Sequence, residues 1–191
     1  MTSFEFVFSL FSILLGLALA QVLRGFADVV EAGARIRIGW PTFLLALVVM
    51  ADLTLFWRVV WEARGDMPDT STALFVTLII SGLYYFAAVM VFPRKIAGRS
   101  ELDSHFMAQK GKVLGCLLAA NVIAYAARYA LMGAQSFAAL SSIVPLGVGA
   151  FAALCATGIF VRSRNISIGI VASLLLINLL DPVLNASSSG Q

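Results

Sequence analysis

The stretch WPTFLLALVVMADLTLFWRVVW, residues Trp40–Trp61, decides the fold class of this chain. It is apolar on nearly all sides, and it matches the ~20 residues that an α-helix needs to cross a bilayer. A tryptophan stands at each end, where aromatic side chains commonly mark the membrane interfaces. Its only charged residues are Asp52 and Arg58. The stretch therefore predicts a transmembrane helix.

The rest of the chain has the same character. Of its 191 residues, 61% are hydrophobic and 12% are charged, whereas an ordinary soluble domain is about 25% charged. A chain of this size cannot bury so much apolar surface in a core of its own, so the surplus must face lipid. We predict an all-α polytopic membrane protein, a bundle of six transmembrane helices with short loops that forms a single transmembrane domain over residues 1–191. The six predicted spans are Phe4–Val30, Trp40–Trp61, Ser71–Phe92, Val113–Met132, Phe137–Val161 and Ile166–Leu184.

The first span and the third loop both allow more than one interpretation. Phe4–Val30 is expected to be a retained first helix and not a cleaved signal peptide, because its start lacks Lys and Arg and carries Glu5. The third loop, Pro93–Lys112, is long and charged, and its Leu102–Gln109 stretch is expected to form a short interfacial helix that continues into the fourth span. The fourth and fifth spans are expected to be separated by a break at Gly133–Ser136.

Basic residues predict the orientation. They concentrate in the loops after the first, third and fifth spans, and the positive-inside rule places such loops in the cytoplasm. Both termini are then expected on the outer, periplasmic side, in agreement with an even number of spans. Nine of the thirteen Lys and Arg residues lie in these loops: Arg35, Arg37, Arg94, Lys95, Arg99, Lys110, Lys112, Arg162 and Arg164.

Polar residues inside the predicted spans are the candidate functional residues, because charge in a bilayer costs about 2.5–3.5 kcal/mol on insertion scales and calls for a partner. They could form a polar site open to the outer face, or they could be interhelical pairs that fix packing. We expect Arg128 to find an acidic partner on another helix, Asp181 or Asp52. The full set of this candidate intramembrane cluster is Asp52, Arg58, Asn121, Arg128, Asn178 and Asp181.

A second candidate site lies near the inner boundary of the first span. Arg24 and Asp28 stand four residues apart, so they fall on one face of a helix and could form an ion pair. The simpler interpretation is a paired charge at the membrane boundary, with no function beyond anchoring.

Rare residue types exclude several activities. His105 is the only histidine, which excludes a self-contained bis-histidine haem site and an H-E-x-x-H zinc protease. Cys116 and Cys155 both lie within apolar segments, and they are expected to act as small hydrophobic residues. We expect no cofactor, no resident metal and no nucleic-acid partner.

Four short motifs carry a resemblance to a known protein family. They are SILLGLALA at Ser12–Ala20 leading to Val22, Leu23 and Gly25; Arg35-Ile36-Arg37 ahead of Trp40-Pro41; Phe92-Pro93; and Asp103-Ser104-His105-Phe106. Together they resemble a widespread bacterial family of small six-helix membrane proteins with no assigned function. The resemblance would extend over nearly the whole chain. It implies the six-helix fold and a bacterial inner-membrane location, and it implies no activity and no site residue.

Three hypotheses of function follow. The first is a non-enzymatic membrane protein that acts through helix–helix contacts, as a homo-oligomer or as an accessory subunit of a membrane complex. The alternative is a small channel or transporter with a polar path along Asp52, Asn121, Arg128 and Asp181. An intramembrane enzyme acting on lipid would have only His105 and Asp103 near the inner interface. We therefore expect that the protein is not an enzyme.

Overall fold

The protein is all-helical in the computed structural model, which describes residues 3–31, 39–62, 64, 71–93, 99–138 and 143–188. Within these ranges the side chains at both ends of the chain and around the α4–α5 connection are not described. The helices are α1 (Ser3–Glu31), α2 (Trp40–Glu62), α3 (Ser71–Val91), α4 (Arg99–Ala138), α5 (Ile143–Phe160) and α6 (Arg164–Ser188).

Local sequence sets several helix ends. α2 begins beside Gly39, whose carbonyl accepts hydrogen bonds from the backbone N–H groups of Thr42 and Phe43. Pro41 lies in this first turn, where a missing N–H costs nothing. α3 ends just before Phe92-Pro93, because a proline disfavours helical geometry in the residue before it. Ser163 precedes α6, and its carbonyl accepts the N–H of Ser167.

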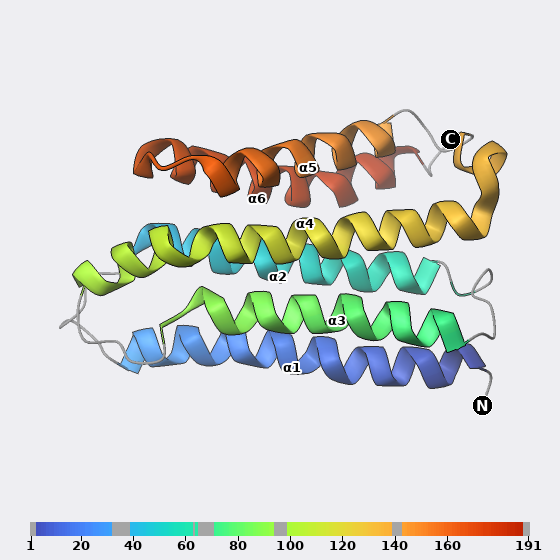
Figure 1. Cartoon of the computed structure of the whole chain (residues 1–191), viewed down its shortest axis with the longest axis horizontal. Coiled ribbons are helices and arrows are strands. Elements are labelled where there is room, and N and C mark those ends of the chain that lie inside the picture. The colour runs from blue at the N-terminus through green and yellow to red at the C-terminus, as the bar shows by residue number, and fades with distance from the viewer. Residues whose placement is uncertain are drawn as a thin grey trace.

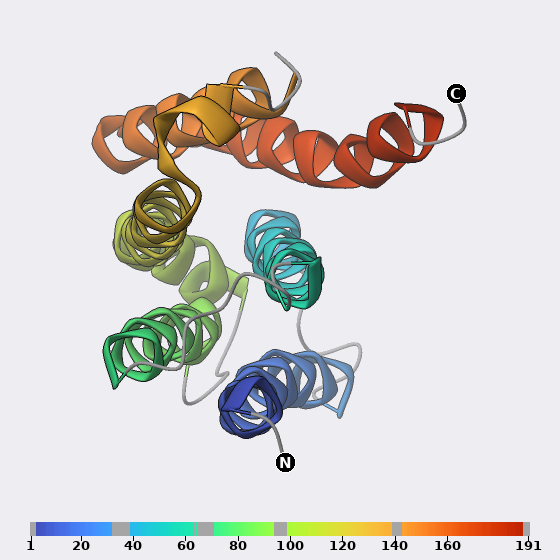
Figure 2. The same cartoon turned by 90° about the vertical axis from the view of Figure 1, so that its right-hand side faces the viewer.

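Four helices form a bundle, and the last two form a second layer on it. Seen end-on in Figure 2, α1, α3, α4 and α2 follow one another around the bundle. α5 packs on α4, α6 packs on α2, and the two also contact each other. In the same view α5 and α6 run at a marked slant across the other four helices. The α5–α6 hairpin thus lies on one side of the four-helix bundle and contributes to the same hydrophobic core.

Consecutive helices alternate in direction, so the molecule has two distinct ends (Figure 1). We call one the basic end: α2, α4 and α6 begin there, α1, α3 and α5 end there, and Lys112, Arg162 and Arg164 lie there. At the opposite end α1 begins and α6 ends, so both ends of the chain lie on the same side.

Four of the helices are long and apolar enough to cross a membrane, which supports the predicted membrane protein. They contain the segments Phe8–Glu31, Trp40–Trp61, Ser71–Val91 and Leu102–Ala130. In the described part of α5 and α6 the apolar stretches are shorter, at Gly147–Phe160 and Arg164–Leu180. The predicted all-helical architecture is therefore confirmed, while six complete spans stay a prediction.

The fourth helix differs from its prediction. α4 is a continuous helix of 40 residues from Arg99 to Ala138, so the interfacial stretch Leu102–Gln109 does continue into the span as expected. The predicted break at Gly133–Ser136 is wrong, because these residues are helical. The ribbon instead turns sharply near its C-terminal end (Figure 1). A lone glycine costs a helix only about 1 kcal/mol, so Gly133 is a weak stop signal.

A glycine on α1 allows the side chain of Phe92, at the end of α3, to pack closely against the α1 backbone. Gly25 is buried on α1, and a Cβ atom there would overlap the ring of Phe92. That ring also packs edge-on against Phe26, with ring centroids 5.2 Å apart. At Gly16, earlier on the same helix, a Cβ atom would meet nothing within 4 Å. Of these two glycines, only Gly25 is required by packing.

Candidate functional site

A buried carboxyl group lies at the centre of α2. Asp52 is 5% exposed. At about 1.5 Å per residue it stands about 18 Å along the axis from Trp40 and about 14 Å from Trp61. Both tryptophans are exposed, as expected for side chains at membrane interfaces. Asp52 therefore lies near the middle of the candidate span Trp40–Trp61.

Two side chains from neighbouring helices bind this carboxylate. The hydroxyl of Tyr84 on α3 donates a hydrogen bond to Asp52 Oδ2 at 3.0 Å. The amide Nδ2 of Asn121 on α4 donates to the same oxygen, also at 3.0 Å. Its other hydrogen bond goes to the backbone carbonyl of Leu117 at 3.0 Å. We call Asp52, Tyr84 and Asn121 the Asp52 triad; it joins α2, α3 and α4 at their centre.

The surroundings of the triad are mainly apolar and aromatic. Tyr84 is fully buried, and its ring lies 5.3 Å, centroid to centroid, from that of Phe56. Cys155 on α5, also buried, is close enough to Asp52 to interact with it electrostatically. Tyr125 on α4 interacts in the same way with Tyr84. Such a low-dielectric site strengthens both hydrogen bonds and makes an unpaired charge costly.

The geometry of the triad favours proton chemistry over metal binding. Both groups that touch Asp52 are hydrogen-bond donors, and a metal ion would need acceptors in their place. No group of three metal-ligating side chains exists among the described residues. The hydrogen bonds shown for Asp52 all end on Oδ2. The second oxygen, Oδ1, is left as the place where a proton can bind.

The structure brings two members of the predicted intramembrane cluster together, Asp52 and Asn121. Sequence reasoning missed Tyr84, because a tyrosine in an apolar span is usually an interface anchor. Its position inside the span, seven residues before the end of Ser71–Val91, was the available signal. Asn178 on α6 is buried, and its Nδ2 has no hydrogen-bond partner among the residues that the structure describes. Arg58 and Arg128 are half-buried on α2 and α4.

The predicted pairings of the other charges are not seen. Nε of Arg128 is buried without a hydrogen-bond partner among the described residues. The side chain of Asp181 lies outside the described part of the structure, and Asp52 is engaged by Tyr84 and Asn121. Arg24 and Asp28 are both exposed on α1, and no ion pair joins these two described side chains. Both pairings therefore stay predictions.

A second polar cluster lies nearer the basic end, where sequence reasoning expected only a loop charge. Lys110 is 3% exposed on α4, and its ammonium group donates three hydrogen bonds. They go to the carbonyls of Gly158, at 3.0 Å, and Val161, and to Ser167 Oγ at 2.8 Å. We call these four residues the Lys110 clamp.

The clamp satisfies the C-terminal end of α5. Gly158 lies in the last turn of that helix and Val161 directly follows it, so their carbonyls lack helical partners. A cation at this position also complements the negative end of the helix dipole. Ser167 in turn donates to the carbonyl of Ser163 at 2.7 Å. One lysine thus fixes α4, α5 and α6 to one another.

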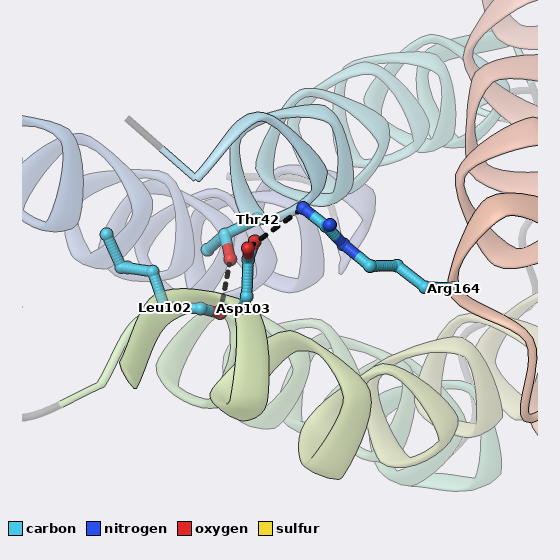
Figure 3. Close-up of polar contacts among 4 residues, drawn as sticks. All are labelled: Thr42, Leu102, Asp103 and Arg164. Carbon is cyan, nitrogen blue, oxygen red and sulfur yellow. Dashed lines mark hydrogen bonds and ion pairs between the residues drawn. The ribbon is translucent and has the colours of Figure 1, made fainter. Parts of the chain in front are cut away.

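Polar contacts at the basic end join α4 to α6, α2 and α3, and the first two of these are drawn in Figure 3. Arg164 at the start of α6 and Asp103 on α4 form an ion pair at 2.8 Å. The hydroxyl of Thr42 on α2 donates to the carbonyl of Leu102 at 3.1 Å. His105 Nε2 lies 3.0 Å from the carbonyl of Met90. Asp103 and His105, the two residues considered for lipid chemistry, thus make separate interhelical contacts.

Comparisons with known proteins give no match: no family model, no curated protein and no solved structure is significantly similar to this chain. The family resemblance inferred from short motifs stays a prediction. Any function must therefore be argued from the Asp52 triad and its place in the bundle.

Proposed function

We propose that this protein is a small channel or transporter of six transmembrane helices in a bacterial inner membrane, and that Asp52 is its functional site. The observation that supports this proposal is a carboxyl group at mid-depth of a membrane helix, enclosed by three helices and bound by two neutral donors. Ionisable residues in such positions typically mark ion or proton pathways.

A purely structural role does not account for an aspartate here. Both donors bind one oxygen, so the amide oxygen of an asparagine could accept the same two hydrogen bonds. That amide would avoid the cost of burying an ionisable group. What a carboxyl adds over an amide is the ability to gain and lose a proton or a counter-ion. We assign this gain and loss of a proton or counter-ion at Asp52 to the transport function.

The lengths of α5 and α6 support six spans in this proposal. α5 has 18 residues and α6 has 25, which correspond to about 27 Å and about 37 Å of helix. The hydrocarbon core of a bilayer is about 30 Å thick, and a tilted or slightly short helix is readily accommodated. The hairpin would then complete an up-down arrangement that begins and ends on one side of the membrane.

Replacing Asp52 with asparagine is expected to abolish transport while leaving the fold intact, because the hydrogen bonds to Tyr84 and Asn121 are retained and only the titratable group is lost. The full-length protein in proteoliposomes would be subjected to jumps in NaCl, KCl, pH and an amino-acid mixture on a solid-supported membrane. We expect currents from the wild type and loss of most of the current from Asp52→Asn.

Asp28→Asn is the matched control for this test, since Asp28 is an exposed carboxylate on α1 far in sequence from the triad. It should retain wild-type currents. Equal currents from Asp52→Asn and the wild type, or no current from any protein with any of these probes, would contradict the proposal.

Orientation is the second testable part of the proposal. We expect both termini outside and the basic end in the cytoplasm, because the helix ends that flank the segments rich in Lys and Arg lie there. In a background with Cys116 and Cys155 replaced by alanine, Ser188→Cys should react with a membrane-impermeant maleimide on intact cells. Lys112→Cys, which is exposed at the basic end, should react only after permeabilisation. The reverse pattern would overturn the orientation.

Assembly with further copies or with other membrane subunits is the second candidate function. It is favoured by small-residue motifs that the chain leaves unfilled: Gly16, Gly115 and Gly149 have nothing within 4 Å of a Cβ position. Motifs of this kind let helices approach closely in a bilayer. If this is the function, the Asp52→Asn protein should support it as well as the wild type.

A further inference from the structure

Resting on the proposed function, we infer that the ion handled at Asp52 is a proton, and that it reaches the carboxyl along a row of tyrosine hydroxyls on α4, Tyr129 and Tyr125, from the end opposite the basic end. The proposed function by itself specifies neither the ion that binds at Asp52 nor the path by which the ion arrives.

The donor set of the triad selects a proton over a metal cation. Na⁺ or K⁺ would need several oxygen acceptors around it, and Oδ2 of Asp52 is instead covered by a hydroxyl and an amide N–H₂. Both donors would have to turn away before a cation could bind that oxygen. A proton requires no such change, because it binds Oδ1 while Oδ2 continues to accept from Tyr84 and Asn121. The step moves one proton from water to the carboxylate, and no other bond changes.

The route follows from helix periodicity. Asn121, Tyr125 and Tyr129 are spaced four residues apart, so they fall on the same side of α4 and rise by about 6 Å at each step. Tyr129 is 50% exposed, Tyr125 is half-buried and Asn121 binds Asp52 directly. α4 runs away from the basic end (Figure 1), so the exposed Tyr129 lies further toward the opposite end than Asn121 and Tyr125. Polar groups at successive positions of such a row, about 6 Å apart along the axis, are within reach of one bridging water, which could pass a proton between the two tyrosine hydroxyls and on to Asp52.

Other groups around Asp52 are consistent with a single titrating carboxyl. Among the side chains that the structure describes, Tyr84 from α3, Tyr125 from α4 and Cys155 from α5 are the titratable groups that interact within this site. The described buried residues of α1 are apolar apart from Gly25, and those of α6 include the non-titratable Ser167 and Asn178. On α2 itself the next charged residue is Arg58, six positions further on.

The test is infrared difference spectroscopy of the full-length protein in lipid, switched between acidic and alkaline buffer at constant salt. We expect a C=O stretching band of a protonated carboxyl in the wild type. It should be lost in Asp52→Asn and retained in Asp28→Asn. Exchanging Na⁺ for K⁺ at constant pH should leave the spectrum unchanged. A band that persists in Asp52→Asn, or a sodium-induced carboxylate change that Asp52→Asn removes, would overturn the inference.

Tyr125→Phe tests the route. After a rapid pH jump, the Asp52 band should reach its full amplitude but appear several-fold more slowly than in the wild type. Tyr85→Phe, a half-buried tyrosine beside Tyr84 in the sequence, is the matched control and should follow wild-type kinetics. If Tyr125→Phe follows wild-type kinetics, the proton does not reach Asp52 along the tyrosine row.

Failure of this inference is distinguishable from failure of the proposed function. An Asp52 carboxyl band without any current on the solid-supported membrane would uphold proton binding and contradict transport. Currents that depend on Asp52, without a pH-dependent carboxyl band, would uphold transport and contradict the proton.

Discussion

Replacement of Lys110 with methionine is expected to lower the free energy of unfolding by about 2–5 kcal/mol. A buried acceptor that loses its donor costs about 1–3 kcal/mol, and the ammonium group of Lys110 serves three acceptors: two carbonyls at the end of α5 and the hydroxyl of Ser167. Methionine fills a similar volume without offering a donor. The measurement is the unfolding free energy of the purified protein in mixed micelles, titrated with denaturing detergent.

Lys112→Met provides the matched control, because Lys112 lies two residues along the same helix and is exposed. It should unfold like the wild type. The loss in Lys110→Met should appear first as separation of the α5–α6 hairpin, since the clamp joins this hairpin to α4. A Lys110→Met protein as stable as the Lys112→Met protein would show that water replaces the ammonium group at the three acceptors.

Much of the fold could be predicted from hydrophobicity alone. The spans around Trp40–Trp61 and Ser71–Phe92 end within a residue or so of α2 and α3, since a change from apolar to charged or Pro-containing sequence marks each boundary. The limits of α4 could not be read in the same way. The stretch Leu102–Gln109 was expected to be an interfacial helix and is helical, but the burial of Leu102 and Phe106 inside the bundle was not expected.

The sites were harder to predict than the spans, and for a physical reason. Sequence gives the depth of a polar residue along its own helix, but it does not give the direction in which the side chain points. Asp52 and Asn121 were placed at similar depth, and the structure shows them in contact. Lys110 was counted as a charge of the third loop because the fourth span was expected to begin at Val113. Two of its three partners are backbone carbonyls, which cannot be recognised from the sequence.

Alanine at Gly25 should lower stability, whereas alanine at Gly16 should leave it unchanged or raise it, although both substitutions add one methyl group to α1. At either position alanine favours the helix over glycine by about 0.5–1 kcal/mol. At Gly25 the methyl group meets the Phe92 ring, which is held between α1 and the end of α3 and packs on Phe26. Overpacking of this kind costs about 1–3 kcal/mol. Gly16→Ala meets open space and should be neutral or stabilising.

Comparing Gly25→Ala with Gly16→Ala separates the effect of packing on stability from the effect of helix propensity, because both positions lie on α1. Gly25→Ala should unfold at lower denaturing detergent than the wild type, and Gly25→Ala combined with Phe92→Leu should recover part of the loss, because the smaller side chain makes room for the methyl group. Equal stability of Gly25→Ala and Gly16→Ala would mean that the Phe92 ring moves aside without cost. The close approach of α1 to the end of α3 would then not depend on a glycine at position 25.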